Sequence, residues 1–185
     1  MRYFVIMGLG FFLVACGESG EPPLVAEEIL QLNPRANQVV FGMDHYMADE
    51  GIRRAHVKAD TAFFIEDESL VELRVMEVTF FNAEGDTTSV LTSREGTYDW
   101  DTGNMTANID VVVVNTRENR RVETSVLNYN SSLDRIWGDQ PTTITEADGT
   151  VIEGTAFETN SRMDRVDLTS AHIVRPGTRQ QQREQ

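Results

Sequence analysis

The stretch Met105-Thr-Ala-Asn-Ile-Asp-Val-Val-Val113 decides the fold class, because apolar residues stand at positions 105, 107, 109, 111 and 113. Successive side chains of a β-strand point to opposite faces of the sheet, so this period of two predicts a strand with one buried face. The same alternation occurs in residues 55–59 and 71–75, and no long window carries the apolar stripe of a helix. The sequence therefore predicts an all-β fold.

The strand pattern also repeats along the chain. Four equivalent positions lie 34, 31 and 30 residues apart: Phe64, Tyr98, Tyr129 and Thr159. Seven residues after each of them stands an apolar residue: Val71, Met105, Ile136 and Val166. Polar turns separate the two positions of each pair, so each unit predicts two antiparallel strands. A unit of this size cannot bury its apolar face alone, and the repeat therefore predicts a stack of hairpins around one core.

Composition excludes several classes of protein. The chain has 185 residues, which suffice for one domain with a hydrophobic core. It carries 30 acidic and 16 basic residues, a net charge of −14, whereas a protein that binds nucleic acid needs a basic face. The single cysteine excludes an internal disulfide and a cysteine metal cluster, and no motif of a catalytic nucleophile occurs. We expect no catalytic residues, no metal and no cofactor.

The first residues predict a secretion signal. Residues 3–14 are all apolar or glycine, a run shorter than the roughly 20 residues of a membrane-spanning helix. The run ends in Leu13-Val-Ala-Cys16, which resembles the lipobox of bacterial lipoproteins. This resemblance implies that residues 1–15 are a signal peptide, that cleavage occurs before Cys16, and that Cys16 is lipidated. Several acyl chains at about 0.8 kcal/mol per buried CH₂ would anchor the protein to a membrane.

Composition also sets the expected domain boundaries. Residues 16–36 are predicted to be the lipidated cysteine and a flexible tether, because they begin with a small, acidic and proline-containing stretch. The folded domain is expected over residues 37–176. Residues 177–185 contain no apolar residue and are predicted to form a disordered tail.

Three stretches of the expected domain resemble the LptC family. They are Gly51-Ile-Arg-Arg-Ala-His-Val-Lys-Ala-Asp-Thr-Ala-Phe-Phe64, Leu91-Thr-Ser-Arg-Glu-Gly-Thr-Tyr98 with the strand after it, and the region from Val122 to Gly154. LptC is the periplasmic protein of the ABC transporter that exports lipopolysaccharide, and OstA-like proteins such as LptA share the repeat. The resemblance implies a single OstA-like β-jelly-roll, a twisted V of antiparallel strands with an apolar groove and unpaired strands at both ends.

The resemblance also implies a function and partners. The protein would receive lipopolysaccharide from the inner-membrane export ABC transporter and hold the acyl chains of lipid A in the groove. It would pass the lipid to an LptA-like periplasmic bridge protein by strand pairing. We therefore expect a periplasmic protein, lipid-anchored to the inner membrane of a diderm bacterium, with the outer membrane as the other possible site. Family members that use a transmembrane helix differ from this chain in their anchor.

Alternation along the strands selects candidate site residues. Those expected to face the lipid groove are Ala55, Val57, Ala59, Val71, Leu73, Met105, Ala107, Ile109, Val111, Val126, Ile136, Ile144, Val166 and Leu168. The last alternating segment has no later strand to cover it, and exposed strand edges are sites of pairing with another chain. Its residues are the candidates for the edge that binds the partner: Ala171, His172, Ile173 and Val174.

A second interpretation of the same residues stays open. The chain can be a β-rich lipoprotein of the outer membrane that binds another protein, with the apolar residues packed into a closed core. Gly17 keeps this alternative open, because in many proteobacterial lipoproteins an aspartate after the lipidated cysteine retains the protein at the inner membrane.

Overall fold

A computed structural model describes residues 33–174, which are built from antiparallel strands. The predicted signal peptide, Cys16, almost all of the tether and the C-terminal tail lie outside these residues. The strands and one 3₁₀ turn follow in chain order: β1 (Gln38–Asp49), β2 (Ile52–Ile65), η1 (Glu66–Glu68), β3 (Leu70–Phe81), β4 (Thr87–Asp99), β5 (Met105–Asn115), β6 (Arg121–Asn130), β7 (Arg135–Gly138), β8 (Thr142–Thr145), β9 (Val151–Gly154), β10 (Ala156–Thr159), β11 (Asp167–Thr169) and β12 (His172–Val174). The all-β prediction is confirmed. Within residues 33–174, no helix is long and apolar enough to cross a membrane.

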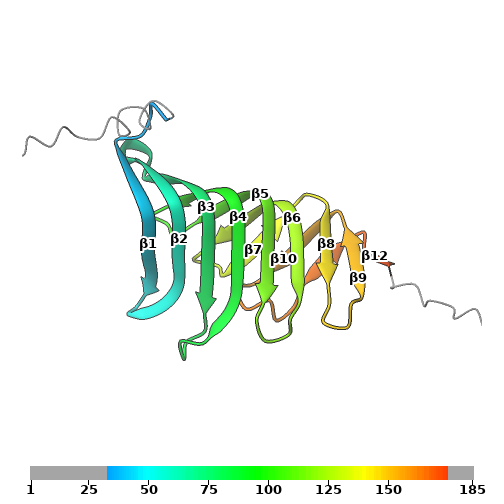
Figure 1. The fold of residues 1–185 in the computed structure, drawn as a ribbon. Helices are drawn as coiled ribbons and strands as arrows, with labels where there is room; N and C mark the ends of the chain where they lie inside the picture. Colours follow the sequence, from blue (N-terminus) through cyan, green and yellow to red (C-terminus); the bar gives the residue numbers. More distant parts are fainter. Residues whose placement is uncertain (1–32, 175–185) are drawn as a thin grey trace, which may run out of the picture.

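The strands form one sheet that divides at β6. Strands β1 to β6 pair in sequence order, each antiparallel to the next (Figure 1). The first half of β6, residues 121–123, pairs with β8, whereas residues 128–130 pair with β7. From there the sheet continues in two directions, as β7–β10–β11 and as β8–β9–β12.

The long strands bend near their middle, and positive φ angles and a bulge in β5 mark the bend. The backbone takes positive φ angles at Gly42 in β1 (62°), at Val75 in β3 (51°), and at Ile109 and Asp110 in β5 (64° and 53°). The pairing of β5 with β6 skips from Asn108 to Val111, so both residues between them stand outside the ladder. A bulge inserts unpaired residues and bends its strand. The first and second halves of each strand therefore belong to two different limbs.

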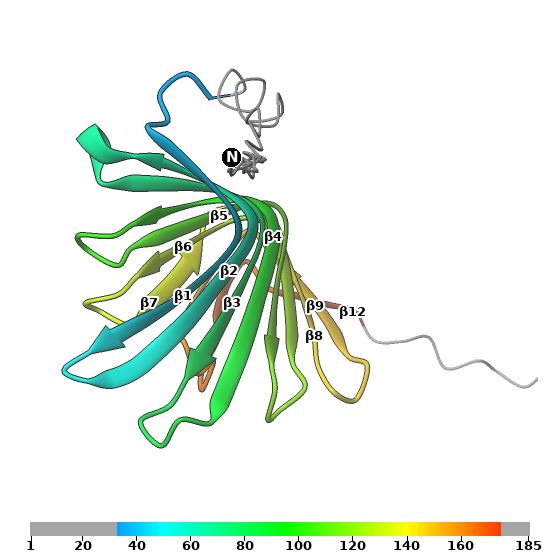
Figure 2. The same cartoon turned by 60° about the vertical axis from the view of Figure 1, so that its left-hand side comes forward.

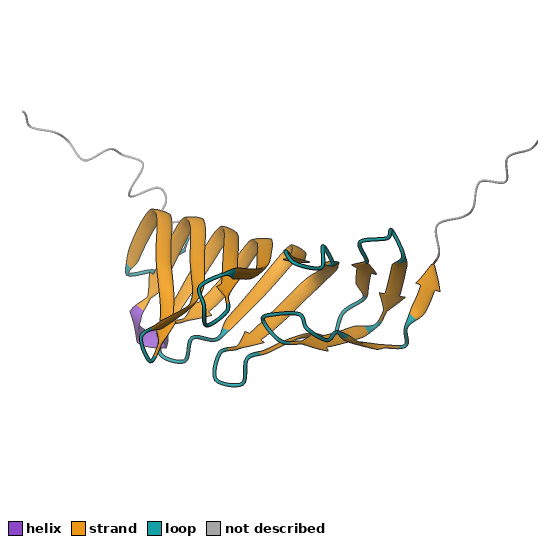
Figure 3. Cartoon of the chain, turned by 90° about the horizontal axis from the view of Figure 1, so that it is seen from below, coloured by secondary structure: helices purple, strands orange, loops and turns teal. Residues whose placement is uncertain are grey.

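We name the limbs by the turns at their ends. Limb A carries η1, the turns at residues 99–104 and 131–134, and strands β7, β10 and β11. Limb B carries the turns at residues 82–86 and 116–120, and strands β8, β9 and β12. Figure 2 looks along the stack and shows the hairpin turns diverging from the bend in two groups, and Figure 3 shows η1 and the C-terminal strands at opposite ends.

The repeat seen in the sequence is present in limb A. Phe64 lies opposite Val71, Tyr98 opposite Met105, and Tyr129 opposite Ile136. Residues directly opposite each other in a sheet share a face, so each aromatic residue packs beside the apolar residue seven positions later. The predicted stack of hairpins is confirmed.

The inner faces of the two limbs form one hydrophobic core. We call it the interior cluster, and its buried members are Met43, Met47, Ala55, Val57, Ala59, Ala62, Val71, Leu73, Met76, Val78, Phe80, Leu91, Tyr98, Met105, Ala107, Val111, Val113, Val122, Leu127, Tyr129, Ile136, Ile144, Phe157 and Met163. Removal of this apolar surface from water is the main force that holds the limbs together.

Candidate functional site

The space between the limbs is the candidate site, and most of the predicted groove residues face it. Ten of them belong to the interior cluster: Ala55, Val57, Ala59, Val71, Leu73, Met105, Ala107, Val111, Ile136 and Ile144. Val166 and Leu168 are half-buried and pack against the cluster. These twelve side chains pack in or against the interior cluster, and their contact with lipid stays a prediction.

The inward orientation predicted for Ile109 and Val126 is wrong. Ile109 is 46% exposed, because it is one of the two bulged residues of β5. Val126 lies opposite Asn108 on the outer face, whereas its neighbour Leu127 lies opposite Ala107 and is buried. The bulge shifts the alternation, and a register shift of one residue moves a side chain to the other face.

The limbs pack directly on each other, so protein side chains fill the predicted groove. The ring of Phe80 in limb B meets the ring of Tyr129 in limb A edge-on, with 5.1 Å between centroids. Near β1, the hydroxyl of Tyr98 and Nε2 of His45 are 3.4 Å apart across the limbs. A Cβ placed on Gly103 would lie 3.1 Å from the terminal methyl of Met47, so this side chain crosses the mouth between the limbs. Closed packing of this kind is what the protein-binding alternative expects.

Sequence reasoning missed several members of the interior cluster. Phe80, Leu127, Phe157 and Met163 were not selected, although each is at most 3% exposed. Leu127 was missed because of the bulge, and Phe157 lies on a short strand with little alternation to read. Met163 lies in the connection between β10 and β11 and belongs to no strand, so strand alternation cannot indicate its orientation. Its position depends on contacts between distant parts of the chain.

Burial desolvates two tyrosines of the interior cluster. Burial raises the pKa of Tyr129 to about 12, with a further contribution from the negative charge of Asp134. Burial also raises the pKa of Tyr98, again with help from a neighbouring carboxylate, Asp99. Desolvation disfavours the charged phenolate, which is why both pKa values move upward. Every buried side-chain nitrogen and oxygen of the described residues has a hydrogen-bond partner.

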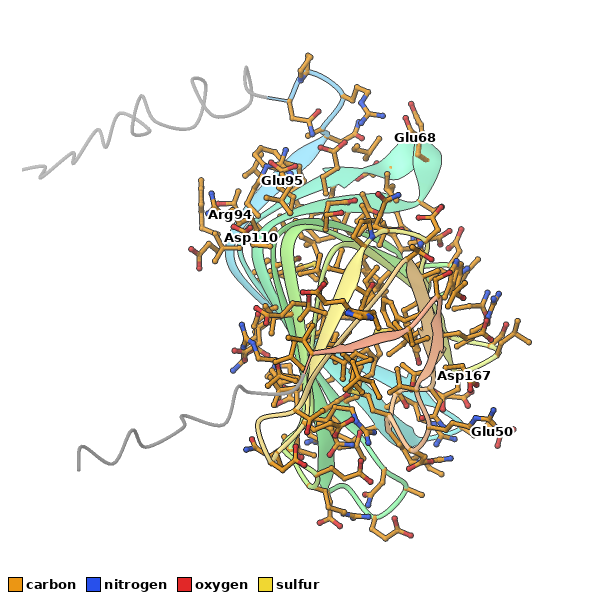
Figure 4. All side chains as sticks on the ribbon, turned by 90° about the vertical axis from the view of Figure 1, so that its right-hand side faces the viewer. Glu50, Glu68, Arg94, Glu95, Asp110 and Asp167 are labelled. Atoms are coloured by element: carbon orange, nitrogen blue, oxygen red, sulfur yellow. The ribbon has the colours of Figure 1, made fainter. Side chains whose placement is uncertain are left out.

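A hollow lies at the bend, and its lining combines three members of the interior cluster, Met43, Ala59 and Met76, with charged side chains of the outer face. Its volume is about 680 Å³, and its lining includes Gly42, Val75, Arg94 and Asp110. Arg94 and Asp110 form an ion pair there and point away from the interior (Figure 4). Charged side chains line much of this surface, so it suits an acyl chain less well than the interior does.

Free strand edges lie at both ends of the stack. Strand β12 pairs with β9 through Ile173 and Ile152, and its other side meets no strand of the described chain. His172, Ile173 and Val174 are all exposed, and Ala171 precedes them in the connection from β11. Within residues 33–174, β12 is therefore an edge strand, while its pairing with a partner stays a prediction. At the opposite end β1 pairs with β2 and with no other strand of residues 33–174, and its Phe41 is 59% exposed.

A bent antiparallel sheet with two packed limbs and open ends is a β-jelly-roll of the OstA-like type. The fold is similar to a crystal structure of LptH, described as the LptA-homologous periplasmic component of the conserved lipopolysaccharide transport device from Pseudomonas aeruginosa. The TM-score is 0.52 at 12% sequence identity, over 66% of this chain and 95% of that one. At such low identity the likeness establishes the fold.

The sequence itself establishes the family. Residues 26–173 match the family described as "Lipopolysaccharide-assembly, LptC-related", and the chain therefore belongs to the LptC family. No curated protein sequence matches the chain significantly. The resemblance inferred from the strand pattern is confirmed, and with it a role in lipopolysaccharide transport.

The raised pKa of Tyr129 gives a test of the closed interior. We expect its phenol to ionise only at about pH 12 in the folded protein, against 10.0 for an ordinary tyrosine. The unfolded chain loses this proton at lower pH than the folded chain does, so stability should fall between these two pH values. Ultraviolet absorbance of tyrosinate measures the titration.

The absorbance change at about pH 12 should disappear in Tyr129→Phe. It should remain in Tyr46→Phe, which changes an exposed tyrosine on β1. Ionisation of all tyrosines near pH 10 in the folded protein would mean that water enters between the limbs.

Proposed function

We propose that this protein carries lipopolysaccharide through the periplasm by binding the acyl chains of lipid A between its two limbs. The observation that supports this most strongly is the interior cluster, a continuous apolar surface enclosed by limbs that join at a bulged bend. An acyl chain that enters between the limbs replaces contacts between side chains with contacts between side chains and lipid. Both surfaces stay out of water, so the exchange costs little of the free energy that apolar burial supplies, about 0.8 kcal/mol per CH₂.

The charge of the protein supports binding through acyl chains rather than through the head group. The chain carries a net charge of −14, and lipopolysaccharide head groups are usually anionic. Like charges repel, so we place the sugars and phosphates outside the limbs and the acyl chains inside.

The free edges support a direction of transfer. We propose that lipopolysaccharide arrives from the inner-membrane export ABC transporter and leaves to an LptA-like periplasmic bridge protein. The bridge protein would pair with the C-terminal edge, where β12 exposes Ile173 (56%) and Val174 (43%). Addition of a strand to a free edge is a common mode of protein recognition, because it satisfies the unpaired backbone groups.

We also propose that Cys16 is lipidated and holds the protein at the periplasmic side of a membrane. The support is Leu13-Val-Ala-Cys16 after an apolar run, together with a domain that needs proximity to a transporter in the membrane.

Photo-crosslinking in cells tests lipid carriage. A photoreactive amino acid at Met47, whose side chain crosses the mouth between the limbs, should crosslink to lipopolysaccharide. The matched control is the same amino acid at Ile109, which is 46% exposed on the outer bend and should give no lipid adduct. Equal adducts at both positions, or adducts of Met47 with protein alone, would contradict the proposal and favour the protein-binding alternative.

Two truncations test the C-terminal edge. Deletion of residues 170–185 removes β12 and leaves β11 in place, whereas deletion of residues 175–185 leaves both strands. We expect the longer deletion to reduce capture of a purified LptA-like protein at least tenfold and the shorter one to leave it unchanged. Because no residue of β12 is buried, the melting temperatures of the two proteins should be similar. If the protein that lacks residues 170–185 still captures the LptA-like protein fully, β12 does not form part of the interface.

Metabolic labelling tests the lipid anchor. Growth with an alkyne fatty acid should label the wild-type protein, and Cys16→Ser should abolish the label and release the protein from the membrane fraction. Ser19→Ala, a change three residues further on, should keep both. Wild-type protein without label would refute lipidation.

A further inference from the structure

The connection between β10 and β11 crosses from limb A to limb B. We call residues 160–164 the strap. In the sequence repeat it is the fourth polar turn, yet it does more than join two strands. The backbone oxygen of Ser161 accepts hydrogen bonds from the hydroxyl of Ser89 at 2.7 Å and from that of Thr88 at 3.2 Å. Both donors lie at the start of β4, at the tip of limb B.

Two more donors of limb B hold the strap. Asn115 at the end of β5 donates from Nδ2 to the backbone oxygen of Arg162 at 2.8 Å. Arg120 donates from Nη1 to the backbone oxygen of Met163 at 3.2 Å. On the other side, the backbone N–H of Ser161 donates to Asp134 in limb A at 3.2 Å. These contacts with limb B run from side chain to backbone, and no strand pairing joins the strap to limb B among the described residues. The strap can therefore leave limb B without disrupting the sheet.

Met163 inserts its side chain from the strap into the interior cluster. Its side chain is fully buried and belongs to the interior cluster. Its backbone takes a φ of 55°, in the left-handed region that side chains other than glycine rarely adopt. Such strain persists only where surrounding contacts impose it, and it occurs often in segments that switch between two positions. Methionine is also the apolar side chain that adapts most easily to changed surroundings.

Two of the four donors that hold the strap, Arg120 and Thr88, keep other partners when it leaves, whereas the hydroxyl of Ser89 and Nδ2 of Asn115 donate to the strap alone among the described residues. Arg120 also donates to Glu146 at 2.9 Å and pairs with Glu118. Thr88 also donates to the backbone oxygen of Phe80 at 3.3 Å. A buried donor without a partner is costly, so these second partners lower the cost of release.

We propose that the strap is the gate of the interior: its release from limb B withdraws Met163, and an acyl chain takes the space that Met163 fills. The inference rests on the proposed function, since the ligand is the lipid of that proposal. Beyond that function, the gate specifies the place where the limbs open, the segment that moves and the side chain that the lipid displaces.

A reversible lock tests the gate. Ser89→Cys combined with Ser161→Cys places two thiols where a hydroxyl and the strap now meet. In the full lipidated chain in detergent, oxidation should reduce binding of radiolabelled hexa-acylated lipopolysaccharide at least tenfold, and a reductant should restore it. The control is Ser89→Cys alone, in which lipopolysaccharide binding should be the same with oxidant and with reductant.

A loosened strap tests the same gate without a crosslink. Ser89→Ala with Asn115→Ala removes two of the donors, and lipopolysaccharide should then bind at least threefold faster. The gate is contradicted if the oxidised double-cysteine variant and the double-alanine variant both bind lipopolysaccharide with the affinity and rate of the wild type. The proposal of lipid carriage would not be affected by that result. If the wild-type protein, the reduced double-cysteine variant and the double-alanine variant all fail to bind lipopolysaccharide, lipid carriage itself is contradicted.

Discussion

The bend in the long strands is the constraint on which the rest of the structure depends. A bulge at Ile109 and Asp110 interrupts the ladder of β5, and positive φ angles at Gly42 and Val75 mark the same bend in β1 and β3, so that one sheet folds back on itself. Without the bend, a sheet with one apolar face would need a second layer to cover it. With the bend, the two halves of each strand cover each other with their apolar faces.

Much of the fold can be predicted from the sequence, because strand alternation and the repeat are local patterns. Phe64 with Val71 and Tyr98 with Met105 pair as their spacing indicates. The orientations of Ile109 and Val126 cannot be predicted in this way, since a bulge leaves the apolar pattern intact while it shifts the register. The burial of Met163 cannot be predicted from local patterns either, because hydrogen bonds from residues about 40 to 70 positions away hold the strap.

Closed packing and lipid transport are compatible in this architecture. Backbone hydrogen bonds run within each limb, whereas side-chain contacts such as Phe80 with Tyr129 join one limb to the other. Apolar contacts are not directional, so a lipid chain can replace them at little cost. The methionines at the mouth and the bend, Met47 and Met76 among them, supply flexible side chains that can repack around a chain of variable position.

The central claim is that acyl chains enter the interior cluster. The most direct measurement is methyl NMR of the protein with ¹³C-labelled methionine, bound to lipopolysaccharide. The account predicts nuclear Overhauser contacts between acyl methylenes and the methyl groups of Met43, Met47, Met76, Met105 and Met163, all of them in the interior cluster. Binding without any such contact would place the lipid elsewhere and contradict the account.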